Sequence, residues 1–160
     1  MQSYVTELRE AVERAVPRLL ALPDEVNARP VSYGKWSPRE IVGHLIDSAS
    51  NNHQRFVRAQ FQDDLIFPRY AQEDWVRVQG YSSAPWQELV TLWQTYNLQL
   101  ARVMAAVPEE VRLKEHSRHN LHQIGWQVVP EESAATLDYL MNDYVGHLKN
   151  HLRQILGADW

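Results

Sequence analysis

Four long segments of this sequence repeat apolar side chains every three or four residues, which is the spacing of an amphipathic α-helix. The segments cover residues 4–22, 37–62, 83–107 and 133–156. No alternating pattern of similar length indicates a sheet. Because four such helices bury their apolar stripes best against one another, we expect an all-α protein, an up-and-down four-helix bundle.

The ends of these predicted helices carry ordinary start and stop signals. Ser37, Pro38 and Glu40 open the second helix as N-cap, first-turn proline and capping-box partner. Pro23 follows the first helix and Gly157 follows the last, at positions where these residues commonly end helices. These signals support the helical assignment independently of the apolar spacing.

Two connecting segments are long for a compact bundle. Residues 63–83 hold proline, glycine and several aromatic side chains, with at most a short helical turn near 72–78. Residues 108–130 contain proline, glycine and three histidines, and the alternating stretch 124–129 indicates a turn with an irregular or extended piece. We expect connections of this length to cover part of the bundle.

Length and composition narrow the class of protein. The 160 residues fit a single domain, residues 1–160, with enough apolar surface for one core. Cysteine is absent, so neither a disulfide nor a thiolate metal site is possible, and nitrogen and oxygen atoms must bind any transition metal. The net charge of −4, from 16 Lys and Arg against 20 Asp and Glu without a cationic cluster, argues against a nucleic-acid partner.

The apolar residues are interrupted too often for membrane insertion. Charged side chains interrupt residues 1–22, so we predict no secretory signal there. No apolar run approaches the ~20 residues that a membrane-spanning helix needs, and no Lys- and Arg-rich face suggests a surface anchor. We therefore expect a cytoplasmic protein that has no membrane partner.

A pair of histidines on the last predicted helix has the spacing of a metal chelate. His147 and His151 are four residues apart, so their rings leave the same face one turn apart. On a helical wheel they lie beside the apolar stripe of Leu137, Leu140 and Tyr144, whereas a solvated pair would lie opposite it. This position favours metal binding over two chance surface histidines.

A third ligand could come from the second predicted helix, which offers His44 and His53. These two point in opposite directions, so at most one of them can reach a shared ion. His44 shares its side of the helix with Ser48, Asn51 and Arg55, a polar stripe that lacks Glu and Lys. This stripe is typical of a groove wall and favours His44, with a solvated edge of a few polar residues as the alternative.

The second helix also resembles the DinB/YfiT-like family, whose motif there reads W-S-x-x-E/Q-x-V-x-H-L-x-D-S-x-x-N-x-x-x-R-F. The matching residues in this chain are Trp36, Ser37, Glu40, Val42, His44, Leu45, Asp47, Ser48, Asn51, Arg55 and Phe56. Weaker similarity is seen at Pro68, Tyr70, Trp75, Tyr144, His147, His151 and Ile155. The resemblance therefore covers most of the chain.

This resemblance implies a four-helix bundle in which His44, His147 and His151 bind one divalent metal ion, with zinc and nickel as the first candidates. It also implies a homodimer and a small-molecule substrate. Members of the family include metal-dependent hydrolases and S-transferases that use a low-molecular-weight thiol. The expected activity is therefore hydrolysis or thiol transfer.

Residues 114–130 depart from the family. They add His116, His119 and His122, which could form a second metal site if the segment were helical. In a glycine-containing loop, surface histidines are the simpler interpretation. The departure also means that the family's substrates cannot be assumed for this chain.

Three neutral imidazoles leave at least one coordination position open, as catalytic metal sites do. A divalent cation there lowers the pKa of water from ~15.7 to near ~7 and deprotonates a thiol, so the site suits either reaction. Asp47 and Asp143 are expected to fix a histidine ring or act as a base, unless they face solvent. Asn51 and Arg55 are expected to contact an anionic or carbonyl group of the substrate, unless Arg55 pairs with a surface carboxylate.

We weigh this metalloenzyme against two other hypotheses. One is a non-catalytic, stress-associated bundle that binds a ligand or uses the metal only to join two helices, because no strong acid–base set is evident. The other is a purely structural role for the histidines, which the lack of mixed charge on the polar stripe disfavours. Neither the metal nor the substrate follows from the sequence.

Overall fold

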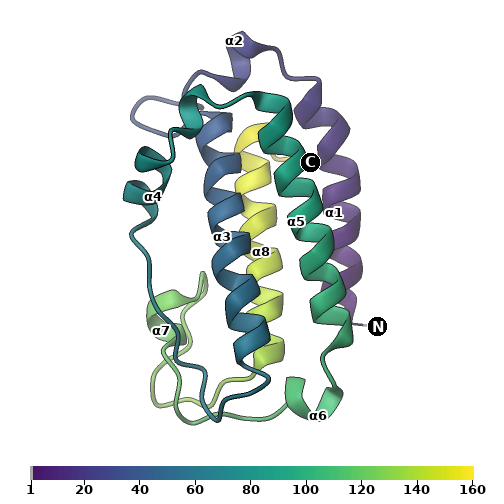
Figure 1. Cartoon of the computed structure of the whole chain (residues 1–160), viewed down its shortest axis with the longest axis vertical. Coiled ribbons are helices and arrows are strands. Elements are labelled where there is room, and N and C mark those ends of the chain that lie inside the picture. Colours follow the sequence, from purple (N-terminus) through teal and green to yellow (C-terminus); the bar gives the residue numbers. More distant parts are fainter. Residues whose placement is uncertain (1) are drawn as a thin grey trace.

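Helices make up the regular structure of residues 2–160, the part of the chain that the computed structural model describes (Figure 1). The four long helices are α1 Ser3–Leu20, α3 Pro38–Arg58, α5 Trp86–Ala106 and α8 Leu137–Leu156. The shorter elements are α2 Asp24–Asn27, α4 Gln72–Val78, the 3₁₀ helix η1 Tyr81–Ser83, α6 Glu109–Arg112 and α7 Leu121–Ile124. None of the described helices is both long and apolar enough to span a membrane.

The four long helices form the expected all-α bundle, which is confirmed, but their directions do not alternate strictly. The Tyr4 hydroxyl donates to Asp138 at 2.8 Å and joins the first turns of α1 and α8, so these two helices run in the same direction. Arg39, near the start of α3, donates to the Ser82 carbonyl just before α5, so α3 and α5 share the opposite direction. The order along the chain is therefore up, down, down, up.

The long segment 59–85 explains this order. It leaves the lower end of α3, climbs the side of the bundle through α4, and brings the chain back to the top, where α5 begins (Figure 1). The up-and-down expectation assumed that each long helix reverses the one before it. Segment 59–85, called the crossover below, corrects that assumption. Apolar spacing alone could not have predicted the direction of α5.

The predicted starts of the four long helices agree with the structure to within four residues. At α3 the Ser37 side chain accepts from the Glu40 N–H, and the Glu40 carboxylate accepts from the Ser37 N–H at 2.8 Å, so the capping box is present. α8 begins at Leu137 rather than at 133, because Thr136 supplies its N-cap and accepts from the Tyr139 N–H at 3.1 Å. Local capping chemistry therefore sets the ends that periodicity leaves imprecise.

The apolar stripes of the four helices meet in one core, as their spacing predicts. Trp93 of α5 and Phe56 of α3 are fully buried within it. Two polar side chains are buried with them and satisfy each other, since the Tyr144 hydroxyl donates to Asn97 Oδ1 at 2.6 Å. Full burial of a large apolar side chain contributes about 1.5–3 kcal/mol, so this shared core is the main source of stability.

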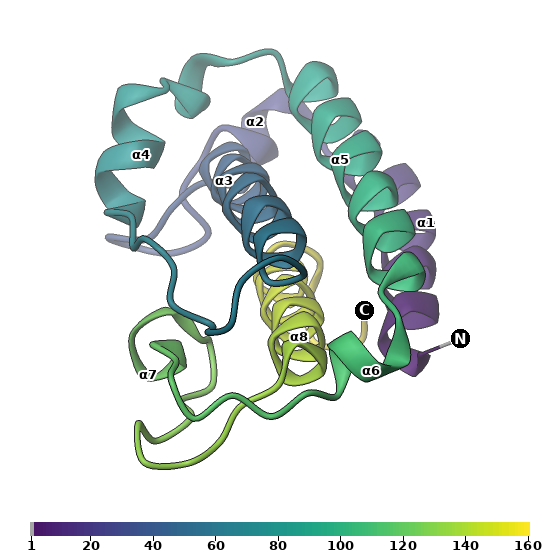
Figure 2. The same ribbon diagram turned by 60° about the horizontal axis from the view of Figure 1, so that its bottom comes forward.

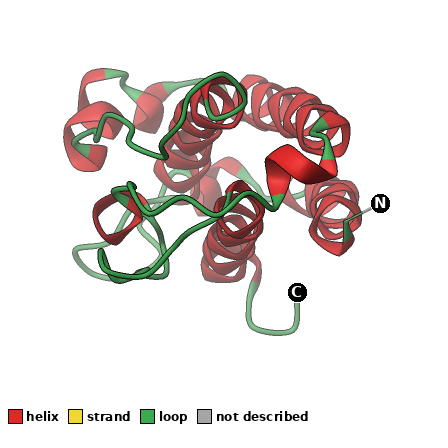
Figure 3. Ribbon diagram, turned by 90° about the horizontal axis from the view of Figure 1, so that it is seen from below, coloured by secondary structure: helices red, strands yellow, loops and turns green. Residues whose placement is uncertain are grey.

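The two long connections cover the same side of the bundle. Figures 2 and 3 show α4 and α7 on the opposite side of α3 and α8 from α1 and α5. The connections also bind each other: the Leu65 N–H donates to the Arg118 carbonyl at 3.0 Å, and the Asn120 amide bonds both backbone groups of Phe67 at 2.8 and 3.1 Å. They form a continuous wall facing the α3–α8 pair.

A glycine on α3 allows the crossover to pack close to that helix. The Tyr81 ring lies against Gly43, where an added Cβ would stand 2.1 Å from Tyr81 Cδ2. The Tyr81 hydroxyl donates to Asp47 Oδ1 at 2.7 Å, so both ends of the ring are held. The contact locks the end of the crossover onto the helix that carries His44.

Gly43→Ala should therefore lower the free energy of unfolding by about 1 kcal/mol, because overpacking costs ~1–3 kcal/mol and the ~1 kcal/mol that alanine gains over glycine inside a helix offsets only part of this cost. Urea unfolding measures the loss. The same substitution in a Tyr81→Leu background should cost less, since the ring that blocks the methyl group is gone. A single variant more stable than the wild type would contradict this packing.

Candidate metal centre

Three histidine rings meet where α3 packs against α8. His44 comes from α3, and His147 and His151 come from successive turns of α8. The Nε2 atoms of His44 and His147 lie 3.3 Å apart, and one nitrogen from each ring lies within 4.8 Å of the others. The rings contact one another edge to face. Because α3 and α8 run antiparallel, the start of one helix meets the end of the other at this point.

The size and chemistry of the cluster suit a divalent transition metal. Imidazole nitrogens bind such an ion at about 2.0–2.1 Å, so two of them on one ion stand at most ~4.2 Å apart. Nitrogens already within 4.8 Å of one another need only a small ring rotation to reach that geometry. An all-nitrogen donor set of this kind accepts zinc, nickel, cobalt or iron.

Burial keeps all three rings neutral near pH 7, because it penalises the charged imidazolium. Burial lowers the pKa of His44 to about 3 and that of His147 to about 2, with a smaller contribution from neighbouring imidazoles. It also lowers the pKa of His151. Each ring can therefore offer a lone pair to a cation without competition from protons.

Two neighbours orient the rings. The Trp36 ring lies 5.1 Å from that of His44, centroid to centroid. Gln154 places its Oε1 3.1 Å from His151 Nδ1, and an Nδ1–H that donates there leaves Nε2 free for a metal. The role of Gln154 was not predicted from the sequence. The available signal was its position three residues after His151 on the same helix.

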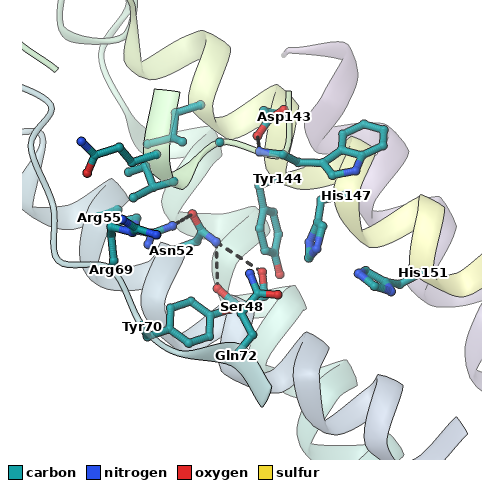
Figure 4. A pocket seen from close by; sticks show the side chains of 15 residues that line it. Ser48, Asn52, Arg55, Arg69, Tyr70, Gln72, Asp143, Tyr144, His147 and His151 are labelled. Atoms are coloured by element: carbon teal, nitrogen blue, oxygen red, sulfur yellow. Dashed lines mark hydrogen bonds between the residues drawn. The ribbon is translucent and has the colours of Figure 1, made fainter. Parts of the chain in front are cut away.

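A cavity of about 520 Å³ opens beside the histidines (Figure 4). His147 and His151 stand at one end of it, and Arg55 and Arg69 stand at the other. Its walls come from α3, from α8 and from both long connections. The lining residues are Ser48, Asn52, Arg55, Arg69, Tyr70, Gln72, Gln123, Ile124, Gly125, Trp126, Leu140, Asp143, Tyr144, His147 and His151.

The α3 wall of this cavity is a row of polar side chains bonded to one another. Asn52 Nδ2 donates to the Ser48 carbonyl at 2.9 Å, and Asn52 Oδ1 accepts from Arg55 Nη1 at 3.3 Å. The helical spacing predicts Asn51 in this row. Asn51 instead donates to the Asp47 carbonyl at 2.9 Å and is absent from the cavity lining, so Asn52 takes the predicted place.

Asp47 belongs to the crossover contact and not to the histidine cluster. Its Oδ1 accepts from the Tyr81 hydroxyl at 2.7 Å and from Gln79 Nε2 at 2.8 Å. Within residues 2–160 it makes no hydrogen bond to a histidine ring, and burial raises its pKa. The structure thus gives Asp47 a positioning role in place of the ring-fixing role expected from the sequence.

Asp143 holds the α7 segment against α8. Its carboxylate accepts from the backbone N–H groups of Trp126 and Gln127 at 2.7 and 2.8 Å, and burial raises its pKa. The Trp126 ring covers Gly146, where an added Cβ would stand 2.8 Å from it. Asp143 therefore builds one wall of the cavity beside His147, which differs from the contact with a histidine ring that we expected.

The remaining histidines lie outside this cluster. His53 faces α5. His116 and His119 are buried and bond to backbone carbonyls of neighbouring loop segments at 3.1 and 2.7 Å, and His122 is half-buried in the same region. Across residues 2–160, the His44 group is the one set of three His, Cys, Asp or Glu side chains close enough to share an ion. The loop histidines therefore tie connections together and do not form a second metal site.

Comparisons with known proteins agree with this architecture. A family model described as the DinB superfamily matches residues 7–155. A protein of Oceanobacillus iheyensis, named provisionally as a metal-dependent hydrolase, is 23% identical over 158 residues that cover 99% of this chain and 84% of that protein. The fold is also similar to that of YfiT from Bacillus subtilis, with a TM-score of 0.78 and 18% identity over 96% of this chain and 82% of that one. YfiT is described provisionally as a metal-dependent hydrolase with an unusual four-helix bundle topology.

The depressed histidine pKa values predict a loss of stability in acid for the metal-free protein. Below about pH 6.5 a histidine in the unfolded chain binds a proton, whereas buried His44 stays unprotonated. The free energy of unfolding therefore decreases as the pH is lowered, until about pH 3. Between about pH 7.5 and about pH 5, one such ring accounts for a loss of ~2 kcal/mol.

Urea unfolding at the two pH values measures this loss. His44→Gln removes the titrating group and should make the pH dependence shallower by about that ~2 kcal/mol. Ile46→Val, a change on the same helix that does not titrate, should lower stability equally at both pH values. An unchanged slope in the His44→Gln variant would contradict the buried neutral ring.

Proposed function

The chain belongs to the DinB superfamily, and from this premise we propose that it is a metal-dependent enzyme that acts on a small molecule. His44, His147 and His151 bind one divalent ion, zinc or nickel, at the end of the cavity. The observation that carries the proposal is the convergence of three neutral rings from two helices beside a polar cavity. The names of the relatives favour hydrolysis as the reaction.

The openness of the cluster supports a catalytic site over a structural one. When bound, a divalent ion supplies a Lewis acid that makes water or a thiol nucleophilic near neutral pH. Structural sites are normally closed by a fourth protein ligand. Within residues 2–160 no fourth His, Cys, Asp or Glu joins the cluster. The chain's part is to hold neutral rings in place, to orient His151 through Gln154, and to leave the cavity side open.

A second cavity favours thiol transfer as the second candidate. It has a volume of about 630 Å³, is lined by Trp36, Ile41 and Glu73 among others, and shares His151 with the first cavity. A low-molecular-weight thiol and a second substrate could therefore occupy separate cavities next to the same histidine. A non-catalytic role in metal or ligand binding is the alternative to both reactions.

Purified without a histidine tag, the wild-type protein should contain about one zinc or nickel ion per chain, as measured by elemental analysis. The variant H147A/H151A should lose that ion, because a single remaining imidazole cannot hold it. His53→Ala, which removes a histidine outside the cluster, should keep it. Undiminished metal content in the double variant would rule out the proposed site.

The same preparations decide the reaction class. Turnover of ester or amide substrates that disappears on chelation supports hydrolysis, and turnover of a thiol with an electrophile supports transfer. A protein that keeps its full metal content but shows neither activity across such a screen has the non-catalytic role.

A further inference from the structure

Arg55 is a buried cation at the end of the cavity farthest from the histidines. The residue is only 5% exposed, yet it lines the cavity together with Arg69. Figure 4 shows both arginines at one end and His147 and His151 at the other. Because a guanidinium does not give up its proton in proteins, this end of the cavity carries permanent positive charge.

The protein itself does not neutralise this charge. In the described residues, no carboxylate forms an ion pair with Arg55 or Arg69. The hydrogen bonds of Arg55 run to two neutral acceptors, Asn52 Oδ1 and the Pro68 carbonyl, both at 3.3 Å. The carboxylate of Asp143 lines the same cavity but is occupied by two backbone N–H groups.

A buried charge without a counter-ion is unusual, because desolvation is costly and buried ions are normally paired. The guanidinium has five N–H donors, and its two hydrogen bonds to the protein use only two of them. Its planar fork matches the geometry of a carboxylate or a phosphate. An oxyanion that enters through the cavity would fit both the charge and the remaining N–H donors of Arg55.

The cavity places this cation at a fixed separation from the histidines. His44 and Arg55 lie on the same side of α3, three turns apart, with Ser48 and Asn52 between them. At ~1.5 Å per residue their backbones are about 16 Å apart along the axis, a span that the long arginine side chain shortens. A molecule that reaches both ends must be elongated.

We propose that Arg55 binds a carboxylate or phosphate group of the substrate and so restricts the site to elongated organic anions whose reactive bond lies at the histidine end. The position of the reactive bond at the histidine end rests on the proposed function. The anion site depends only on the contacts of Arg55. Arg69, exposed at the rim, adds charge that draws anions toward the cavity.

Calorimetric titration of metal-free and metal-loaded protein with glutarate, inorganic phosphate and the neutral diamide glutaramide tests the anion site. At least one of the two anions should bind both forms saturably and about ten-fold or more tightly than glutaramide. Preference for glutarate identifies a carboxylate site, and preference for phosphate identifies a phosphate site. Glutaramide binding as tight as both anions would overturn the proposal, as would anion binding seen only after metal is loaded.

Matched variants assign the binding to one side chain. Arg55→Met should weaken anion binding by about ten-fold or more, and Arg55→Lys should recover part of it, since a lysine keeps the charge without the fork. Arg58→Met is the control, because Arg58 is exposed on the same helix and bonds only Gln54 among the described residues. Wild-type affinity in Arg55→Met would overturn the proposal.

Two outcomes keep this inference separate from the metal site. If Arg55→Met fails to fold, the comparison of anions with glutaramide on the wild-type protein still decides the question. If the protein proves unable to hold a metal ion but binds anions through Arg55, the anion site stands and the proposed enzyme does not.

Discussion

The packing of three uncharged imidazoles, one buried and two half-buried, at the seam between α3 and α8 is the constraint on which the rest of the structure depends. A polar ring nitrogen is costly to bury without a partner, and His44 Nδ1 has none among residues 2–160. The same burial lowers the pKa values of His44 and His147, so the rings act as ligands and not as cations. Apolar packing on the other faces of the same helices holds this locally unfavourable arrangement in place.

The order of helix directions turns this seam into a site. Because the crossover carries the chain back to the top before α5, both long connections fall on the α3–α8 side of the bundle (Figure 2). Tyr81 and Asp47 fix one connection to α3, and Asp143 fixes the other to α8. The helices thus supply the histidines, while the connections supply the walls that decide which molecule reaches them.

The spacing of residues along the sequence predicted the helices and the side chains that share one helix face. The site features that it did not predict depend on contacts between segments far apart in the sequence. Apolar periodicity predicted the four helices, and the four-residue spacing predicted that His147 and His151 share a face. The polar neighbours of His44 favoured it over His53, and the structure places His44 in the cluster. Asn52 was missed because adjacent residues flank the same stripe and only tertiary packing shows which flank faces the cavity. Asp47 and Asp143 bind partners far away in the sequence, and the helical period carries no information about such contacts. The homodimer and the cytoplasmic location stay predictions.

X-ray absorption spectroscopy of the zinc-loaded protein tests the central claim most directly. We predict three imidazole nitrogens at ~2.0–2.1 Å from the zinc, completed by oxygen from solvent, and a shell of two imidazoles in the His44→Gln variant. A shell of oxygen atoms alone, or an imidazole count that His44→Gln leaves unchanged, would contradict it.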